Sequence, residues 1–245
     1  MAEWWEEAFR ADYLRVYPHR DDKEAALDLK AVRMRLPCLD AGRRVLDLAC
    51  GAGRHLRAME AQGMRAIGAD LSPDLLEEAR RRGARNLVRC DMRKLPFRDA
   101  AFDAVTMWFN SFGYFSTDEE DASVLREASR VLLPDGGLVL ELMDARELRR
   151  NLVPRSETTK GEVEVLEERS LADDGRRVRK QVTLRRGTTV RTWTESVRLY
   201  SEDEVRRMAE QVGMKLREFG REEGDDVWRL GRVPRMVLSF VKAAA

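Results

Sequence analysis

Short apolar runs recur along the first part of the chain, and longer segments with helical spacing of apolar positions separate them. The runs that predict strands are 45–48, 65–69, 86–89, 104–108 and 138–142. Ser72 followed by Pro73, and Thr117 with Glu120, are typical helix starts, and a turn is expected at 134–137. Strands that alternate with helices at this spacing predict a parallel sheet with helices on both faces.

The pattern changes after Asp144. Between about residues 161 and 199, apolar and polar positions alternate, with turn signals at 173–175 and at Gly187, which predicts antiparallel hairpins. A helix is then expected from Ser201 to Gly213, followed by strands at 215–219 and 235–241. The last two strands fit an antiparallel pair at the end of an otherwise parallel sheet.

The N-terminal segment is predicted to be helical, with a break at Pro18 and a second helix over 22–36. Aromatic and apolar residues recur at helical spacing in its first half: Trp4, Trp5, Phe9, Tyr13 and Val16. Such a stripe is typical of a helix that packs on a core or covers one as a lid.

Composition narrows the class of protein. The 245 residues include 45 Lys and Arg against 44 Asp and Glu, so the net charge of +1 gives no general attraction to a polyanion and disfavours a nucleic-acid partner. Cys38, Cys50 and Cys90 are too few and too scattered for a disulfide framework or a metal site, and no metal is expected. Because no apolar stretch resembles a signal peptide or a membrane span, a cytoplasmic protein with no membrane partner is expected.

Small and acidic residues follow the predicted strands. The first strand leads into VLDLACGAGR, in which Gly51 and Gly53 permit a tight turn and close approach of a ligand to the backbone. Asp70, at the end of the second strand, is placed to accept two hydrogen bonds from a ribose diol. Leu56 stands where a GxGxxG dinucleotide motif would have its third glycine, which disfavours a nicotinamide dehydrogenase.

Five segments in order, VLDLACGAGR, GADLS, CDMRKLPF, FDAVTMWFNSFGYF and LLPDGGLVLEL, resemble the successive motifs of class I S-adenosylmethionine-dependent methyltransferases. The resemblance implies an α/β, Rossmann-like sheet of seven strands, parallel with an antiparallel final strand and covered by helices on both faces. It also implies three parts: an N-terminal helical lid (1–36), a cofactor-binding domain (37–150 and 200–245), and an inserted antiparallel β-hairpin subdomain (151–199).

The resemblance also implies roles for individual residues toward S-adenosylmethionine and its product, S-adenosylhomocysteine. The methionine part is expected at Asp47, Ala49, Gly51 and Gly53, and its amino group at the turn of Phe109 and Asn110. Asp70 is expected to hold the ribose, and Leu71, Asp91 and Met92 the adenine. Ala49 departs from the fuller motif, which has a glycine there.

The sequence indicates the residues that bind the methyl acceptor less clearly than those that bind the cofactor. The fourth strand ends in FNSFGY, not in the (D/N/S)PP(Y/F/W) of enzymes that methylate planar amino nitrogens. The candidate acceptor-binding residues are Tyr17, Phe112, Tyr114, Trp193 and Arg198, and the catalytic candidates are Tyr13 and His19. The aromatic residues of 112–115 could equally pack the helix that begins at Thr117, and Trp193 and Arg198 could equally belong to a homodimer face. His55 is read as structural.

The leading hypothesis is a metal-independent transfer of a methyl group to a nitrogen or oxygen of a small-molecule acceptor by in-line displacement. Two alternatives remain open from the residues: an RNA or protein methyltransferase, and a cofactor-binding regulatory protein without transferase activity. Strongly salt-dependent RNA binding would favour the first, and cofactor binding without methyl transfer would favour the second.

Overall fold

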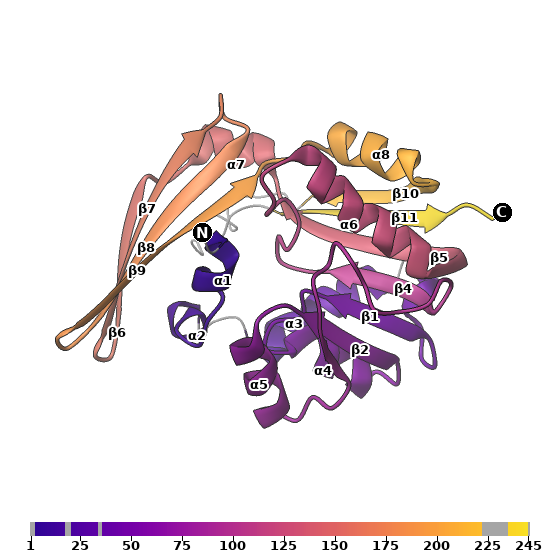
Figure 1. The fold of residues 1–245 in the computed structure, drawn as a ribbon, viewed down its shortest axis with the longest axis horizontal. Coiled ribbons are helices and arrows are strands. Elements are labelled where there is room, and N and C mark those ends of the chain that lie inside the picture. The colour runs from indigo at the N-terminus through magenta and orange to yellow at the C-terminus, as the bar shows by residue number, and fades with distance from the viewer. Residues whose placement is uncertain (1–2, 18–20, 34–35, 222–234, 245) are drawn as a thin grey trace.

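The computed structural model describes residues 3–17, 21–33, 36–221 and 235–244. A seven-stranded sheet forms its centre, in the order β10-β11-β5-β4-β1-β2-β3 (Figure 1). The strands are β1 (Arg44–Leu48), β2 (Arg65–Asp70), β3 (Leu87–Arg89), β4 (Phe102–Met107), β5 (Leu132–Met143), β10 (Met214–Arg221) and β11 (Arg235–Lys242). Strands β1 to β5 pair in parallel, whereas β11 runs antiparallel to both β5 and β10. The predicted fold class is confirmed.

Helices cover both faces of this sheet. On one face, α6 (Asp118–Val131) and α8 (Glu202–Gln211) contribute Val124, Leu125, Val205 and other buried residues to a large apolar core. On the other face lie α3 (Asp22–Arg33), α4 (Arg54–Ala61) and α5 (Pro73–Arg81), with a short 3-10 turn η1 (Pro37–Leu39). Helix α3 packs on α4 and so belongs to this layer. The division of the chain into three parts stays a prediction.

The predicted helix starts are present as capping interactions. The Thr117 hydroxyl accepts a hydrogen bond from the Glu120 backbone N–H at 3.2 Å, and the Glu120 carboxylate accepts one from the Thr117 N–H at 3.3 Å. Ser201 and Glu204 repeat this arrangement at the start of α8, and Ser72 caps α5. Local sequence therefore sets where these helices begin.

Replacing Thr117 by alanine is expected to destabilise the protein by about 1 kcal/mol, because the first turn of α6 loses a hydrogen-bond acceptor for its free N–H groups. Urea denaturation followed by circular dichroism measures this loss. Ser116→Ala, at the neighbouring exposed position, is the control and should leave the free energy of unfolding almost unchanged. Equal effects of the two substitutions would contradict the capping role.

The turn expected at 134–137 is instead part of β5, which begins at Leu132. The register with β4 shifts there: Phe102 pairs with Leu132, but Ala104 pairs with Gly137. Asp135 has φ of 60°, so the backbone bends within the strand rather than ending it. The Pro-Asp-Gly-Gly signal therefore marks a bulge in a long strand and not a separate turn.

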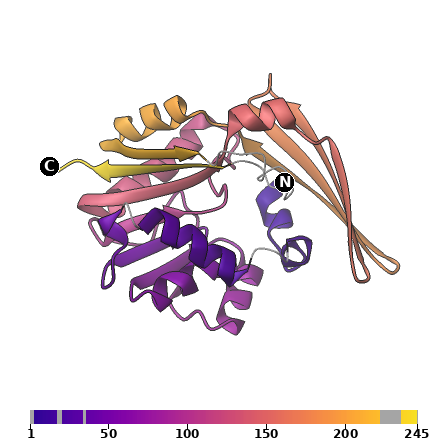
Figure 2. The same cartoon turned by 180° about the vertical axis from the view of Figure 1, so that it is seen from behind.

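A second, four-stranded antiparallel sheet follows α7 (Ala145–Asn151), in the order β6-β7-β8-β9. Its strands are β6 (Arg155–Lys160), β7 (Val163–Ala172), β8 (Arg177–Arg186) and β9 (Thr189–Arg198). The short helices α1 (Trp4–Ala8) and α2 (Tyr13–Val16) lie between this sheet and the main one, as both views show (Figures 1 and 2). Ala8 and Val16 are buried against Val165, Val182 and Leu184. The N-terminal segment thus joins the second sheet to the rest of the molecule.

Candidate active site

The turn after β1 has a backbone that few residues can adopt. Ala49, Gly51 and Gly53 have φ of 59°, 55° and 73°. A Cβ built on Gly51 would meet only the Leu75 Cδ1 atom, at 3.9 Å, so the space beside Gly51 is open. A Cβ on Gly53 would press on Ala79 and Ala84 at 3.2 and 3.4 Å. Gly51 therefore leaves room for a ligand, whereas Gly53 lets α4 pack closely on its neighbours.

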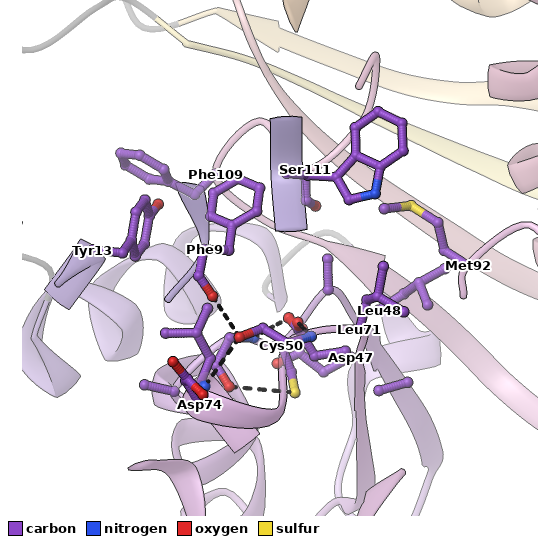
Figure 3. A pocket seen from close by; sticks show the side chains of 18 of the residues that line it. Phe9, Tyr13, Asp47, Leu48, Cys50, Leu71, Asp74, Met92, Phe109 and Ser111 are labelled. Atoms are coloured by element: carbon purple, nitrogen blue, oxygen red, sulfur yellow. Dashed lines mark hydrogen bonds between the residues drawn. The ribbon is translucent and has the colours of Figure 1, made fainter. Parts of the chain in front are cut away.

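A cavity of about 500 Å³ lies over this turn, at the carboxyl ends of β1 to β4. Eight of the ten predicted cofactor residues line it: Asp47, Ala49, Gly51, Asp70, Leu71, Asp91, Met92 and Phe109. Figure 3 shows several of them around the space, together with Phe9 and Tyr13 from the N-terminal segment. The other two, Gly53 and Asn110, lie outside the lining, and the Asn110 side chain instead accepts a hydrogen bond from the Met143 N–H.

Asp70 ties the glycine turn to the next strand. One carboxylate oxygen accepts the Gly51 N–H at 2.7 Å, and the other accepts the Ser72 N–H at 2.8 Å. Burial raises the pKa of Asp70, and these backbone hydrogen bonds oppose the rise. Each oxygen keeps a further lone pair, so the carboxylate can still accept hydrogen bonds from a pair of hydroxyl groups.

Asp47 is buried beneath the turn. Its Oδ1 accepts a hydrogen bond from the Thr106 hydroxyl at 3.3 Å, and its Oδ2 has no hydrogen-bond partner among the described residues. Burial, opposed in part by Thr106 and by the charge of Arg54, raises the pKa of Asp47 to about 7. The site therefore holds a carboxyl group that a cationic ligand group would ionise.

Three further buried groups at the cavity have hydrogen atoms without an acceptor among the described residues: Arg54 Nη2, Trp108 Nε1 and Ser111 Oγ. Sequence analysis missed all three as site residues. Trp108 and Ser111 flank the predicted pair Phe109 and Asn110. Their position at the end of a predicted strand could have indicated them as site residues. A zwitterionic amino-acid group has a carboxylate that accepts hydrogen bonds and an ammonium group that donates them. The three donors match the carboxylate, and the unpaired Asp47 oxygen matches the ammonium group.

The far end of the cavity is lined by Leu71, Cys90, Asp91 and Met92. Arg93 donates hydrogen bonds to both carboxylate oxygens of Asp91: from Nη2 to Oδ2 at 2.7 Å, and from its backbone N–H to Oδ1 at 2.8 Å. Partial burial raises the pKa of Asp91, but the hydrogen bonds and charge of Arg93 outweigh it and hold the pKa below its usual range. Asp91 is thus ionised and fixed in place beside an apolar slot. Burial raises the pKa of Cys90 to about 11, so its thiol stays protonated.

Aromatic rings form the opposite wall. Ring centroids of Phe9 and Tyr13 are 5.1 Å apart, those of Tyr13 and Tyr17 4.9 Å, and those of Phe9 and Tyr114 5.4 Å. The N-terminal segment is anchored to the main domain, because the Ala11 N–H donates to Asp74 at 3.2 Å and the Trp4 indole donates to the Tyr114 carbonyl at 3.2 Å. We call residues 3–17 the roof of the cavity.

Three predicted acceptor residues lie outside the cavity lining. Phe112 is 1% exposed and packs in the main core against Tyr200. Trp193 is buried in the apolar cluster under α1 and α2. The Arg198 guanidinium pairs with Asp118 at 3.2 Å and with Glu204 at 2.6 Å. Contacts between distant segments determine the positions of these three side chains. The local sequence pattern that predicts strands contains no information on those contacts. Tyr13, Tyr17 and Tyr114 do line the cavity, and His19 lies outside the described residues.

His55 also reaches the cavity wall, where its ring stacks on Trp108 with centroids 4.5 Å apart. Burial, helped by the charge of Arg54, lowers the pKa of His55 to about 3. The imidazole is therefore neutral, and its Nε2 lies 3.3 Å from Asp28. These contacts agree with a structural role.

Within the described part of the chain, no group of three or more His, Cys, Asp or Glu side chains could hold a metal ion. No helix in those same residues is long and apolar enough to cross a membrane. All three cysteines are free.

The residues present fit S-adenosylmethionine. Asp47 Oδ2 and the unpaired donors match the charged amino-acid end, Gly51 leaves room for it, and Asp70 has acceptor capacity for a ribose diol. Fold and site define a class I S-adenosylmethionine-dependent methyltransferase domain. Residues 45–136 match the family model described as "Methyltransferase domain".

Curated relatives match mainly in this region. The chain is 42% identical over 104 residues to the demethylmenaquinone methyltransferase of Clavibacter sepedonicus, which covers 41% of each protein. It spans less than half of the length of the curated relatives it matches.

Solved structures match over almost the whole chain. An S-adenosylmethionine-dependent methyltransferase from Clostridium acetobutylicum has a TM-score of 0.75 at 18% identity, over 95% of this chain and 96% of that one. CalS10, an amino pentose methyltransferase from Micromonospora echinaspora solved with the cofactor bound, has a TM-score of 0.69 at 23% identity, over 94% of this chain and 96% of that one. At these identities the likeness concerns the fold alone.

Proposed function

We propose that this protein transfers a methyl group from S-adenosylmethionine to a nitrogen or oxygen atom of a small molecule. The observation that carries the proposal is the roofed cavity: eight of the ten predicted cofactor residues form its floor, and aromatic side chains of residues 3–17 form the opposite wall. A cavity of about 500 Å³ accommodates ligands of metabolite size, and the second sheet stands behind the roof. A folded protein or an RNA helix would not fit without displacing the roof.

When bound, S-adenosylmethionine supplies a methyl group on a positively charged sulfur. Asp70 would hold the ribose, Asp91 with Leu71 and Met92 the adenine, and Asp47 with Arg54 and Ser111 the amino-acid end. Phe9, Tyr13 and Tyr114 would exclude water and fix an acceptor, since positioning of the two reactants can supply several kcal/mol of the barrier reduction. Among the described residues, Tyr13 is the candidate to orient the methyl acceptor or to take up the proton that the acceptor loses.

Relatives named for small-molecule acceptors support the proposal, whereas other relatives are named for tRNA. The Clavibacter sepedonicus relative is named for demethylmenaquinone, and CalS10 is named for an amino pentose. Both names denote small molecules, but the two molecules differ. The acceptor of this protein therefore has to be identified by experiment.

Purified protein should transfer tritiated methyl groups from S-adenosylmethionine to at least one member of a panel of small amines, amino sugars, phenols and alcohols. Bulk tRNA and native protein should remain unlabelled, because neither a folded RNA nor a folded protein fits under the roof. A denatured-enzyme sample is the control for spontaneous methylation. Labelling of tRNA or protein alone would contradict the proposal, and so would tight binding of S-adenosylhomocysteine without transfer to any acceptor.

A further inference from the structure

A cluster of charged side chains beside the cavity joins four elements, and Arg54 is the member that lines the cavity. Glu24 and Asp28 come from α3, Arg54 from α4, Glu141 from β5 and Arg235 from β11. Arg54 pairs with Glu24 at 2.5 Å, and Arg235 pairs with Glu141, with Glu24 at 3.5 Å and with Asp28 at 3.9 Å. The side chains of Glu141 and Arg235 are only 4% and 7% exposed. Buried charges are costly, so a cluster of this size calls for an explanation.

The cluster holds the turn at the end of β4. The Glu141 side chain accepts the Phe109 N–H at 3.0 Å, and the Glu141 backbone carbonyl accepts the Asn110 N–H at 2.8 Å. Phe109 and Asn110 have φ of 54° and 59°, a left-handed conformation that costs non-glycine residues about 1 kcal/mol or more each. Two such residues in succession need support from outside the turn.

The arginines reach the same turn. The guanidinium carbons of Arg54 and Arg235 lie 5.2 and 5.3 Å from the centroid of the Phe109 ring, within the range of cation–π contacts. Phe109 lines the cavity, and its neighbours Trp108 and Ser111 each present an unpaired donor there. Glu141 and Arg235 themselves do not line the cavity.

We propose that Glu141 and Arg235 form a positioning pair for the cofactor site, which sets the place of the Phe109–Asn110 turn and, with it, the donors of Trp108 and Ser111. This proposal rests on the proposed function. Arg235 belongs to the last strand, so the pair makes the binding of the cofactor's amino-acid end depend on the docking of β11 beside β5. Neither residue touches the ligand, and both act through Phe109.

Isothermal titration of the 245-residue protein with S-adenosylhomocysteine tests the pair. Glu141→Gln keeps an oxygen for the Phe109 N–H but loses the charge that Arg235 pairs with, and we expect affinity about tenfold weaker. Glu141→Leu, which offers no acceptor, should weaken affinity further, so glutamine should restore part of the loss relative to leucine. Arg235→Lys keeps the charge but not the planar fork, and it should weaken affinity severalfold.

Glu127→Gln is the matched control. Glu127 also accepts a backbone N–H, that of Leu95 at 2.7 Å, and pairs with an arginine, Arg130, at 2.7 Å, but it does not line the cavity. Its substitution should reduce thermal stability without changing affinity for S-adenosylhomocysteine. Thermal unfolding of every variant accompanies the titrations.

The outcomes separate the two proposals. If the unaltered protein does not bind S-adenosylhomocysteine, the proposed function fails. If it binds and the Glu141 and Arg235 variants bind equally well, the positioning proposal alone is wrong. Should Glu141→Gln or Glu141→Leu fail to fold, Arg235→Lys decides, and unchanged affinity in that variant overturns the proposal. A loss of affinity in Glu127→Gln as large as in Glu141→Gln would also overturn it.

Discussion

Replacement of Asp70 by asparagine is expected to weaken binding of S-adenosylhomocysteine about 100-fold, which corresponds to about 2.7 kcal/mol. The carboxylate accepts the Gly51 and Ser72 N–H groups on separate oxygens and has lone pairs left for a ribose diol. Asparagine offers one oxygen, and its NH₂ group would face one of the two backbone N–H groups. The substitution therefore disturbs the turn and removes acceptors for the ligand at once.

Asp103→Asn is a suitable control for this titration. Asp103 also accepts a backbone N–H, that of Arg44 at 3.0 Å, and pairs with Arg43, but it does not line the cavity. Its substitution should leave the dissociation constant within twofold. An Asp70→Asn protein that folds and binds with unchanged affinity would show that the cofactor does not use this carboxylate.

Replacement of Asp47 by asparagine is expected to remove a pH dependence of stability. Burial raises the pKa of Asp47 from 3.8 to about 7 in the folded protein, so folding favours the protonated form. The stabilising contribution is fully present below about pH 4 and is lost as pH rises through about 7. The shift corresponds to on the order of 4 kcal/mol as an upper bound.

Urea denaturation of the ligand-free protein from pH 4 to pH 8 measures this effect as the difference between unaltered protein and Asp47→Asn. The difference should shrink or change sign in favour of the variant as pH rises. Asp103→Asn is the control, because its difference from the unaltered protein should stay almost constant from pH 4 to pH 8. Burial raises the pKa of Asp103, but hydrogen bonds from Arg44 and Arg43 outweigh it and lower the pKa, so its contribution is lost only as pH falls below about 4. A pH-independent difference for Asp47→Asn would contradict an uncharged Asp47.

The same group links pH to ligand binding. If Asp47 receives the cationic amino group of the cofactor, binding near pH 6 ionises the carboxyl group and releases a proton. Titrations in buffers of different ionisation enthalpy detect that proton, and it should be absent in Asp47→Asn.

Sequence reasoning brought most of the predicted cofactor residues to one place because its signals are local. The glycine turn and the acidic residues Asp47, Asp70 and Asp91 all follow predicted strands, and the carboxyl ends of parallel strands meet at one edge of the sheet. Eight of the predicted cofactor residues consequently line one cavity. The acceptor side was less predictable, since Phe112, Trp193 and Arg198 take their positions from core packing and ion pairs between distant segments.

The sequence by itself determined the alternation of strands and helices, the helix starts at Thr117 and Ser201, and the order of the methyltransferase motifs, because each depends on residues close together in the chain. Only the tertiary structure decided that β11 inserts between β5 and β10, and that Arg235 reaches Glu141 behind the Phe109 turn. These features join segments separated by many residues. Their energies come from burial and charge pairing across the fold, which no local pattern records.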